Sequence, residues 1–252
     1  MKRSITTFFA LLFSGSLVWA QGIKDTSIYV PLIHIGLGAQ LPGADMAKRF
    51  GPNASVGLGL DFKLESQWII GGSATYLFSN KIKEKGILDS IKAGGNEGFI
   101  IDQNGQFADV RLFERGGTWT LNFGRLFPIG KGNPNSGIVA KIGLGGMAHK
   151  IRIEDIGNRS PQLQKEYKKG YDRLTMGYVI SEYVGYMYIS ENKMINFFAG
   201  LEFYQGFTRS ARSYNFDTME RDNSKRLDLL HGIRVGWILP LYKKTAKDIY
   251  YY

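Results

Sequence analysis

Residues 195–208 read INFFAGLEFYQGFT, a run in which bulky apolar side chains alternate with small or polar ones. One face carries Ile195, Phe197, Ala199, Leu201, Phe203 and Phe207, and the other carries Asn196, Gly200, Glu202, Tyr204, Gly206 and Thr208. Because successive side chains of a β-strand point to opposite faces, a period of two predicts a strand with one apolar face. A second face made of glycine and isolated charges is typical of the interior of a narrow β-barrel, with lipid on the apolar side.

The same alternation recurs along the chain. The predicted strands cover residues 29–40, 54–64, 67–78, 117–128, 137–149, 174–189, 195–208 and 227–242. These runs hold about 11 to 16 residues, whereas strands of globular proteins average about five or six and a tilted membrane-spanning strand needs about 9–11. The sequence therefore predicts an all-β protein, a single transmembrane antiparallel up-and-down β-barrel of about eight strands.

The links between the predicted strands alternate in length. Those after the second, fourth and sixth strands are short and cover 65–66, 129–136 and 190–194. Those after the first, third, fifth and seventh strands are longer, and 79–116 holds about 38 residues. Short periplasmic turns that alternate with long extracellular loops are typical of outer-membrane barrels. We therefore expect both ends of the barrel domain in the periplasm, and the loops 79–116, 150–173 and 209–226 outside the cell.

The first residues have the pattern of a secretory signal peptide. Lys2 and Arg3 precede a short, mainly apolar run over 5–18, and Ala20 places a small side chain at the expected cleavage point. The sequence predicts a signal peptide at 1–20 and a barrel domain at 21–252. The chain has no cysteine, so neither disulfides nor a lipid-modified cysteine are expected.

The formal net charge of the chain is +10. A basic surface on an exported protein suits an anionic lipid surface better than nucleic acid, because the compartment offers the first and not the second. We therefore expect outer-membrane lipids, including lipopolysaccharide, and protein partners in the outer membrane, but no nucleic acid. In the loop 150–173, six basic residues are candidates for contacts with lipid phosphates: Lys150, Arg152, Arg159, Lys168, Lys169 and Arg173. A solvated loop face is the alternative interpretation of the same residues.

Several segments resemble a known family. They are KGYDRLT at 169–175, NFFAG at 196–200, GWILP at 236–240 and the terminal YYY at 250–252. In sequence the chain resembles an outer-membrane β-barrel family widespread in Bacteroidota, and in architecture it is similar to the OmpA/OmpX-type eight-stranded barrels. The resemblance implies the fold and the location, and it brings no activity, cofactor or catalytic residue with it.

Charged residues on the predicted interior faces form a candidate lumen site. Glu202 and Arg234 lie on neighbouring strands, each about seven residues from the periplasmic end, so antiparallel pairing places them at similar depth. Asp61, Lys63 and Lys141 belong to the same inward set. Since an isolated buried charge is costly, we expect an ion-pair network that fills the lumen. A proton path or a gate is the alternative role.

Two further features concern single residues. Glu182 interrupts an apolar face between Ile180 and Val184, so either a β-bulge turns it inward or protein covers the outer face there. The segment 102–105 (DQNG) predicts a hairpin tip rather than a calcium loop, because no glutamate follows at the twelfth position.

No catalytic or metal motif is present. The three histidines, His34, His149 and His231, have no ligand spacing, so no metal and no cofactor are expected. The alternation places His34 inward near the periplasmic end, His149 toward the outside of the cell and His231 on the apolar face. His149 with Asp155, Asp172 or Ser181 cannot be assembled into a catalytic group from the sequence.

The expected function is therefore that of a non-enzymatic integral outer-membrane barrel, a structural component or accessory subunit of a larger assembly. A small pore or transport-associated barrel is the first alternative, and a lipid-modifying membrane enzyme is the second. A continuous water path would favour the pore, and a Ser-His-Asp cluster at one rim would favour the enzyme. Polar residues on the lipid-facing surface would favour partner binding.

Overall fold

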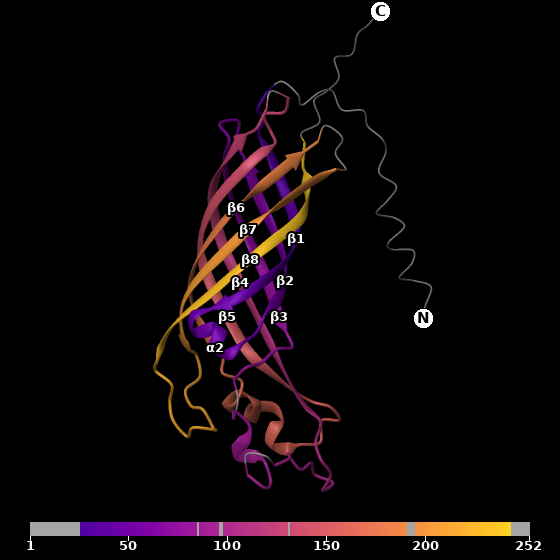
Figure 1. Ribbon diagram of the computed structural model, residues 1–252, viewed down its shortest axis with the longest axis vertical. Helices are drawn as coiled ribbons and strands as arrows, with labels where there is room; N and C mark the ends of the chain where they lie inside the picture. Colours follow the sequence, from indigo (N-terminus) through magenta and orange to yellow (C-terminus); the bar gives the residue numbers. More distant parts are fainter. Residues whose placement is uncertain (1–25, 85, 96–97, 131, 191–194, 243–252) are drawn as a thin grey trace, which may run out of the picture.

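The computed structural model describes residues 26–84, 86–95, 98–130, 132–190 and 195–242. The predicted signal peptide and the terminal tyrosines lie outside the described residues. Eight antiparallel strands form a closed barrel in which each pairs with its sequence neighbours and β8 pairs with β1 (Figure 1). The strands are β1 (Val30–Gly43), β2 (Asn53–Lys63), β3 (Trp68–Ser79), β4 (Val110–Pro128), β5 (Gly137–Asp155), β6 (Thr175–Ile189), β7 (Asn196–Ser210) and β8 (Lys225–Pro240). The prediction of an eight-stranded up-and-down barrel is confirmed.

Strands β4 and β5 are longer than predicted. They pair without interruption from Val110 opposite Asp155 to Pro128 opposite Gly137, so their ribbon extends past the rest of the wall. In the extension, outward positions such as Arg111 and Arg152 are exposed and charged. An apolar outer face is required only where lipid covers the barrel. The alternation of apolar and polar residues in the sequence therefore ends before β4 and β5 themselves end.

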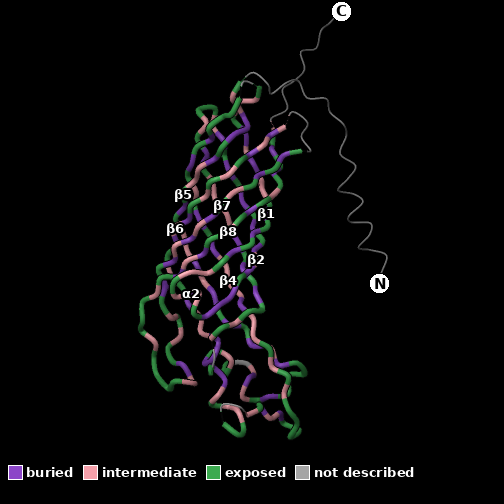
Figure 2. Tube along the Cα trace, in the orientation of Figure 1, coloured by how far each residue is buried: buried purple, intermediate pink, exposed green. Residues whose placement is uncertain are grey.

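Buried and exposed residues alternate along the strands of the barrel wall (Figure 2). The exposed ones include many large apolar side chains, whereas many of the buried ones are polar or charged. On β2, Leu58 and Leu60 are exposed while Ser55, Asp61 and Lys63 are buried. The exposed apolar side chains continue around the wall and include Ile35, Leu37, Ile70, Trp119, Leu121, Phe123, Ile142, Leu144, Val184, Leu201, Ile233, Val235 and Trp237. We call this surface the lipid-facing belt, because so large an apolar surface suits hydrocarbon rather than water.

The links separate the two ends of the barrel as the sequence predicts. The connections β2–β3, β4–β5 and β6–β7 lie at one end, together with the start of β1 and the end of β8 (Figure 1). This is the short-turn end. The connections 80–109, 156–174 and 211–224 lie at the opposite, long-loop end and contain the 3-10 helices η1 (Asp89–Ile91), η2 (Pro161–Leu163) and η3 (Lys165–Gly170). In the described part of the chain, no helix is long and apolar enough to cross a membrane.

The first link differs from the prediction of a long loop. It spans only 44–52 and contains the short helix α2 (Ala44–Arg49). Met46 and Phe50 of this link are fully buried and belong to an apolar cluster with Leu77, Ile151 and Leu230. Helix α2 therefore closes the long-loop end of the barrel.

The short-turn end has an apolar layer of its own. It contains Val30, Leu32, Ile69, Leu126, Val139, Met187, Ile189, Phe198 and Ile238. Apolar side chains thus close both ends of the lumen, and the charged side chains of Asp61, Lys141, Glu202 and Arg234 lie between them.

Candidate functional site

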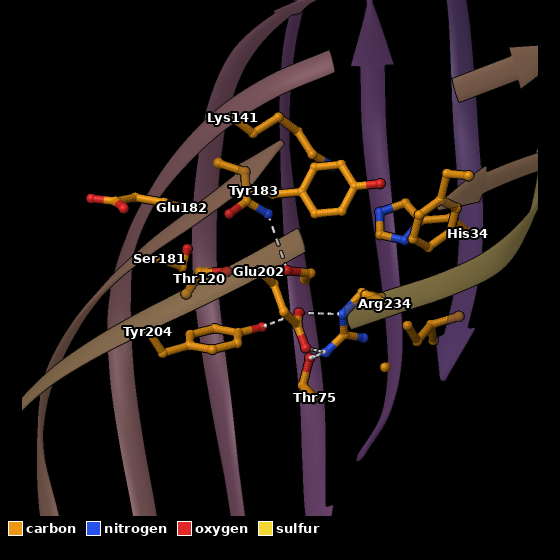
Figure 3. A pocket seen from close by; sticks show the side chains of 15 residues that line it. His34, Thr75, Thr120, Lys141, Ser181, Glu182, Tyr183, Glu202, Tyr204 and Arg234 are labelled. Carbon is orange, nitrogen blue, oxygen red and sulfur yellow. Dashed lines mark hydrogen bonds and ion pairs between the residues drawn. The ribbon is translucent and has the colours of Figure 1, made fainter. Parts of the chain in front are cut away.

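A small chamber whose lining includes charged, amide and hydroxyl side chains lies in the lumen (Figure 3). Its volume is about 50 Å³, and its lining includes His34, Thr75, Thr120, Asn122, Lys141, Ser181, Tyr183, Glu202, Tyr204 and Arg234. A second cavity of about 20 Å³ follows beside Asp61 and Lys141. A single water molecule needs roughly 10–15 Å³ of such volume, so the chamber holds a few waters and is too small for a nutrient.

Glu202 and Arg234 meet in this chamber. Nε of Arg234 donates to Oε2 of Glu202 at 2.5 Å, and Nη2 donates to Oε1 at 3.3 Å. Each charged residue faces a glycine across the β7–β8 ladder, Glu202 opposite Gly232 and Arg234 opposite Gly200. A Cβ on Gly57 of β2 would lie 2.4 Å from Nη1 of Arg234, so a glycine there leaves room for the guanidinium.

Neutral groups complete the hydrogen bonding of this pair. Gln40 donates to Oε1 of Glu202 at 2.5 Å, and the Tyr204 hydroxyl donates to Oε2 at 3.2 Å. The hydroxyls of Ser55 and Thr75 accept from Nη2 of Arg234 at 3.4 and 3.3 Å. A buried ion pair is favourable only when its remaining donors and acceptors are satisfied, and this pair meets that condition.

Asp61 and Lys141 form a second, separate ion pair. Nζ of Lys141 lies 3.0 Å from Oδ2 of Asp61, and Nε2 of His34 lies 3.4 Å from the same oxygen. The Lys141 ammonium also lies 5.3 Å from the centre of the Tyr183 ring. Four of the five predicted lumen residues therefore form two adjacent pairs, and the charges within each pair cancel.

Lys63 does not join the lumen pairs. Its Nζ donates to Asn135 Oδ1 at 2.9 Å and to Ser27 Oγ and Ile28 O, both at 3.1 Å. Lys63 lies one pleat beyond Asp61, where β2 reaches the short-turn end and neutral oxygens are available. The expectation that Lys63 belongs to the ion-pair network is corrected: it ties the segment before β1 to the β4–β5 turn.

A third charged cluster lies under helix α2. Nη2 of Arg49 lies 2.6 Å from Oδ1 of Asp228, and Nε2 of His149 lies 2.9 Å from Oδ2. The hydroxyl of Thr208 donates to the same Oδ2 at 2.6 Å, and Arg49 donates to Thr175 at 3.0 Å. The alternation of apolar and polar residues along β8 predicts that the side chain of Asp228 points into the lumen. Arg49 lies in a link between strands, so no such alternation predicts where its side chain points.

Catalytic groups do not assemble from the residues that the sequence singled out. His149 contacts Asp228, whereas Asp155 accepts the Ser160 N–H at 2.8 Å. Asp172 accepts from Nε of Arg212 at 2.7 Å, and this hydrogen bond raises the pKa of Arg212. Among the described residues, no three His, Cys, Asp or Glu side chains lie close enough to hold a metal ion.

Solved structures with a similar overall shape are small outer-membrane barrels. Ail, the attachment invasion locus protein of Yersinia pestis, has 11% identity and a TM-score of 0.46, with 84% of this chain and 99% of Ail covered. OprG of Pseudomonas aeruginosa has 14% identity and a TM-score of 0.39, with coverages of 85% and 98%. Neisserial surface protein A has 8% identity and a TM-score of 0.39, with coverages of 83% and 96%. No known family description and no curated protein sequence matches the chain.

Glu182 stays on the outer surface of the barrel. The ladders of β6 with β5 and β7 run in constant register past it, so no bulge turns it inward. Glu182 is among the residues that line the chamber, but its exposed side chain extends away from Glu202 and Arg234 (Figure 3). Nε2 of Gln205 donates to Oε1 of Glu182 at 3.4 Å, and the register places Ile142 and Phe203 on either side.

His231 lies on the same outer face. It is exposed, directly opposite Phe203 on β7, and the two ring centres are 5.7 Å apart. We call Glu182, Phe203, Gln205 and His231 the belt patch. It forms a polar area within the lipid-facing belt.

The six basic residues predicted to contact lipid do not form one surface. Lys150 lies 3.8 Å from Asp172, Arg152 lies 3.0 Å from Glu154, and Lys169 lies 2.5 Å from Glu166. Arg159 is exposed and Lys168 is half-buried. The expectation that Arg173 contacts lipid phosphate is wrong, because its guanidinium is largely buried and pairs with Glu84 and Asp217.

The predicted hairpin tip at 102–105 is confirmed. Ile101 bridges to Phe107, and the Asp102 carboxylate accepts the backbone N–H groups of Asn104 and Gln106 at 2.8 and 2.9 Å. Gly105 supplies the positive φ, 75°, that the turn requires.

Proposed function

We propose that this chain is a closed, non-conducting barrel of the outer membrane that acts as an accessory subunit. The belt patch is the surface that binds its partner, a membrane-embedded protein that presents a hydrogen-bond donor or a basic side chain to Glu182. The long-loop end lies outside the cell. The even number of strands supports this orientation, because export leaves the mature N-terminus in the periplasm.

The observation that carries the proposal is the exposed carboxylate of Glu182 at the centre of strand β6. Ile142 and Phe203 flank it, and its one hydrogen bond in the described structure, from Gln205, is long. On the lipid-facing surface of a membrane barrel, a lysine or arginine at the bilayer midplane costs about 2–4 kcal/mol and a carboxylate costs less. Ionisable residues at membrane depth almost always face protein or water. A donor from a second protein would remove most of this cost, whereas lipid would not.

The filled lumen supports an anchoring role over conduction. Apolar layers close both ends, and two neutralised ion pairs occupy the space between them. Eight-stranded barrels have interiors that side chains fill, so an open channel would require these pairs to separate. Long loops that contain short helices remain available for contacts outside the membrane.

Extraction of the tagged chain in mild detergent, followed by native electrophoresis, tests the proposal. The Glu182→Leu variant should lose the partner band, while the wild type and a Glu65→Leu control retain it. Glu65 is an exposed acid in the β2–β3 turn, far from the belt patch. Unchanged complexes in the Glu182→Leu variant would contradict partner binding through this patch.

A further inference from the structure

We propose that Arg209 and Lys225 form a binding site for a phosphate group of a membrane lipid. The site lies at the edge of the lipid-facing belt toward the long-loop end, on strands β7 and β8. It was not among the basic residues that the sequence singled out, and it rests on the outer-membrane location proposed above.

The two cations face each other across neighbouring strands. Arg209 and Lys225 are direct partners at the outermost rung of the β7–β8 ladder, and both are exposed. In an antiparallel pair, side chains at directly opposite positions have Cβ atoms about 4.5–5.5 Å apart. Two positive charges at that spacing repel each other and destabilise the ladder unless an anion lies between them.

The described residues supply no such anion. In the described part of the chain, neither Arg209 nor Lys225 has an ion pair or a side-chain hydrogen bond, although nearby cations do. Arg226 pairs with Asp222, and Arg212 pairs with Asp172. Asp45, which reaches β8 from helix α2, is engaged by Lys48 at 2.8 Å and by the N–H of Leu227 at 3.0 Å. Arg209 and Lys225 are therefore two cations without an ion pair that the ladder holds directly opposite each other.

The surroundings indicate a lipid rather than a free anion. Phe207 and Leu227 lie two residues further along the same outward face and pair with each other, and Tyr178 lies opposite Phe207 on β6. All three are exposed apolar or aromatic side chains of the belt. Acyl chains would contact these side chains while the phosphate reaches the guanidinium and the ammonium. Charge-assisted hydrogen bonds from arginine and lysine are the usual means of holding phosphate.

Native mass spectrometry of the purified full chain in neutral detergent tests the site. Diphosphoryl lipid A is the probe, and the Arg209→Gln/Lys225→Gln variant should bind it about tenfold more weakly, equivalent to about 1.4 kcal/mol. The matched control is Arg111→Gln/Arg152→Gln. It removes the same charge from outward positions on neighbouring strands, but Asp109 and Glu154 already neutralise those two arginines. The control should bind lipid A as the wild type does.

Further measurements separate the alternatives. The exchanged variant, Arg209→Lys/Lys225→Arg, keeps both charges and should retain binding, which excludes misfolding as the cause of the loss. Phosphate-free lipid A should bind poorly to the wild type. Equal binding by all variants would overturn the site, and displacement of lipid A by an equal concentration of inorganic phosphate would overturn its assignment to a lipid. Neither of these two outcomes affects the partner band in native electrophoresis, which depends on Glu182. The lipid-phosphate site and partner binding at the belt patch can therefore be contradicted separately.

Discussion

Arg49 of helix α2 reaches into the barrel and contacts Asp228 of strand β8, with Nη2 and Oδ1 2.6 Å apart. Both side chains are buried, and His149 and Thr208 bind the second carboxylate oxygen. The contact fastens the first link across the long-loop end. It explains why a connection that the sequence predicts as a loop is folded inside the wall.

Loss of this contact should loosen helix α2. A cysteine placed at the fully buried Met46 reports the position of the helix, because a water-soluble maleimide reaches it only when α2 leaves the barrel mouth. We expect slow labelling in the otherwise wild-type chain and clearly faster labelling when Arg49→Gln is added. Arg111→Gln, an exposed substitution, serves as the control. Equal rates in all three proteins would show that the Arg49–Asp228 contact does not hold the helix.

The lumen pair should show strong coupling in a double-mutant cycle. Glu202→Gln or Arg234→Met alone leaves a buried charge without its partner, so each should lower the free energy of unfolding by about 3–5 kcal/mol. The double variant should be milder, since no charge remains stranded. Urea unfolding in detergent micelles measures the three values. Small, additive effects would mean that the two side chains are hydrated or apart.

The closed lumen also predicts low conductance. Purified monomer in a planar bilayer should give no stable large openings, because the side chains of two ion pairs and two apolar layers fill the interior. The Glu202→Gln/Arg234→Met variant should remain closed, since the apolar layers are unchanged. Long-lived large openings of the wild type would favour the pore function instead.

The orientation of the barrel can be tested by labelling of intact cells. Single cysteines at the exposed positions Asn104 and Asn158 lie in long loops, and one at Ser66 lies in the β2–β3 turn. A membrane-impermeant reagent should label the first two in intact cells and the third only after the outer membrane is permeabilised. The reverse pattern would place the long-loop end in the periplasm.

The sequence predicted the strands of the barrel wall well, but it did not predict that helix α2 covers the long-loop end. The difference has a physical reason. Lipid outside and a crowded lumen inside impose a period of two, so alternation located all eight strands and the inward direction of Glu202 and Asp61. The period of two does not predict the position of helix α2, because α2 is held in the barrel mouth by a tertiary contact between Arg49 and Asp228. Arg209 and Lys225 were missed because their juxtaposition depends on the register of two strands.

The Glu182 carboxylate should destabilise the barrel when its partner is absent. In lipid vesicles that contain only this chain, Glu182→Leu should raise the free energy of unfolding by about 1–2 kcal/mol, because an apolar side chain replaces a carboxylate in the belt and a carboxylate there costs less than the about 2–4 kcal/mol of a lysine or arginine. Glu65→Leu in the water-exposed turn should change it by less than about 0.5 kcal/mol. A destabilised Glu182→Leu barrel would mean that Glu182 has a structural role within the monomer.

A photo-crosslinking side chain at Phe203 in living cells tests partner binding at the belt patch most directly. Phe203 lies between Glu182 and His231, and Leu121 on strand β4 provides an exposed control position across the barrel. We predict one discrete adduct with another outer-membrane protein from position 203, its loss in the Glu182→Leu background, and none from position 121. Absence of an adduct at 203, equal adducts at both positions, or an adduct with only a second copy of this chain would contradict the accessory-subunit function.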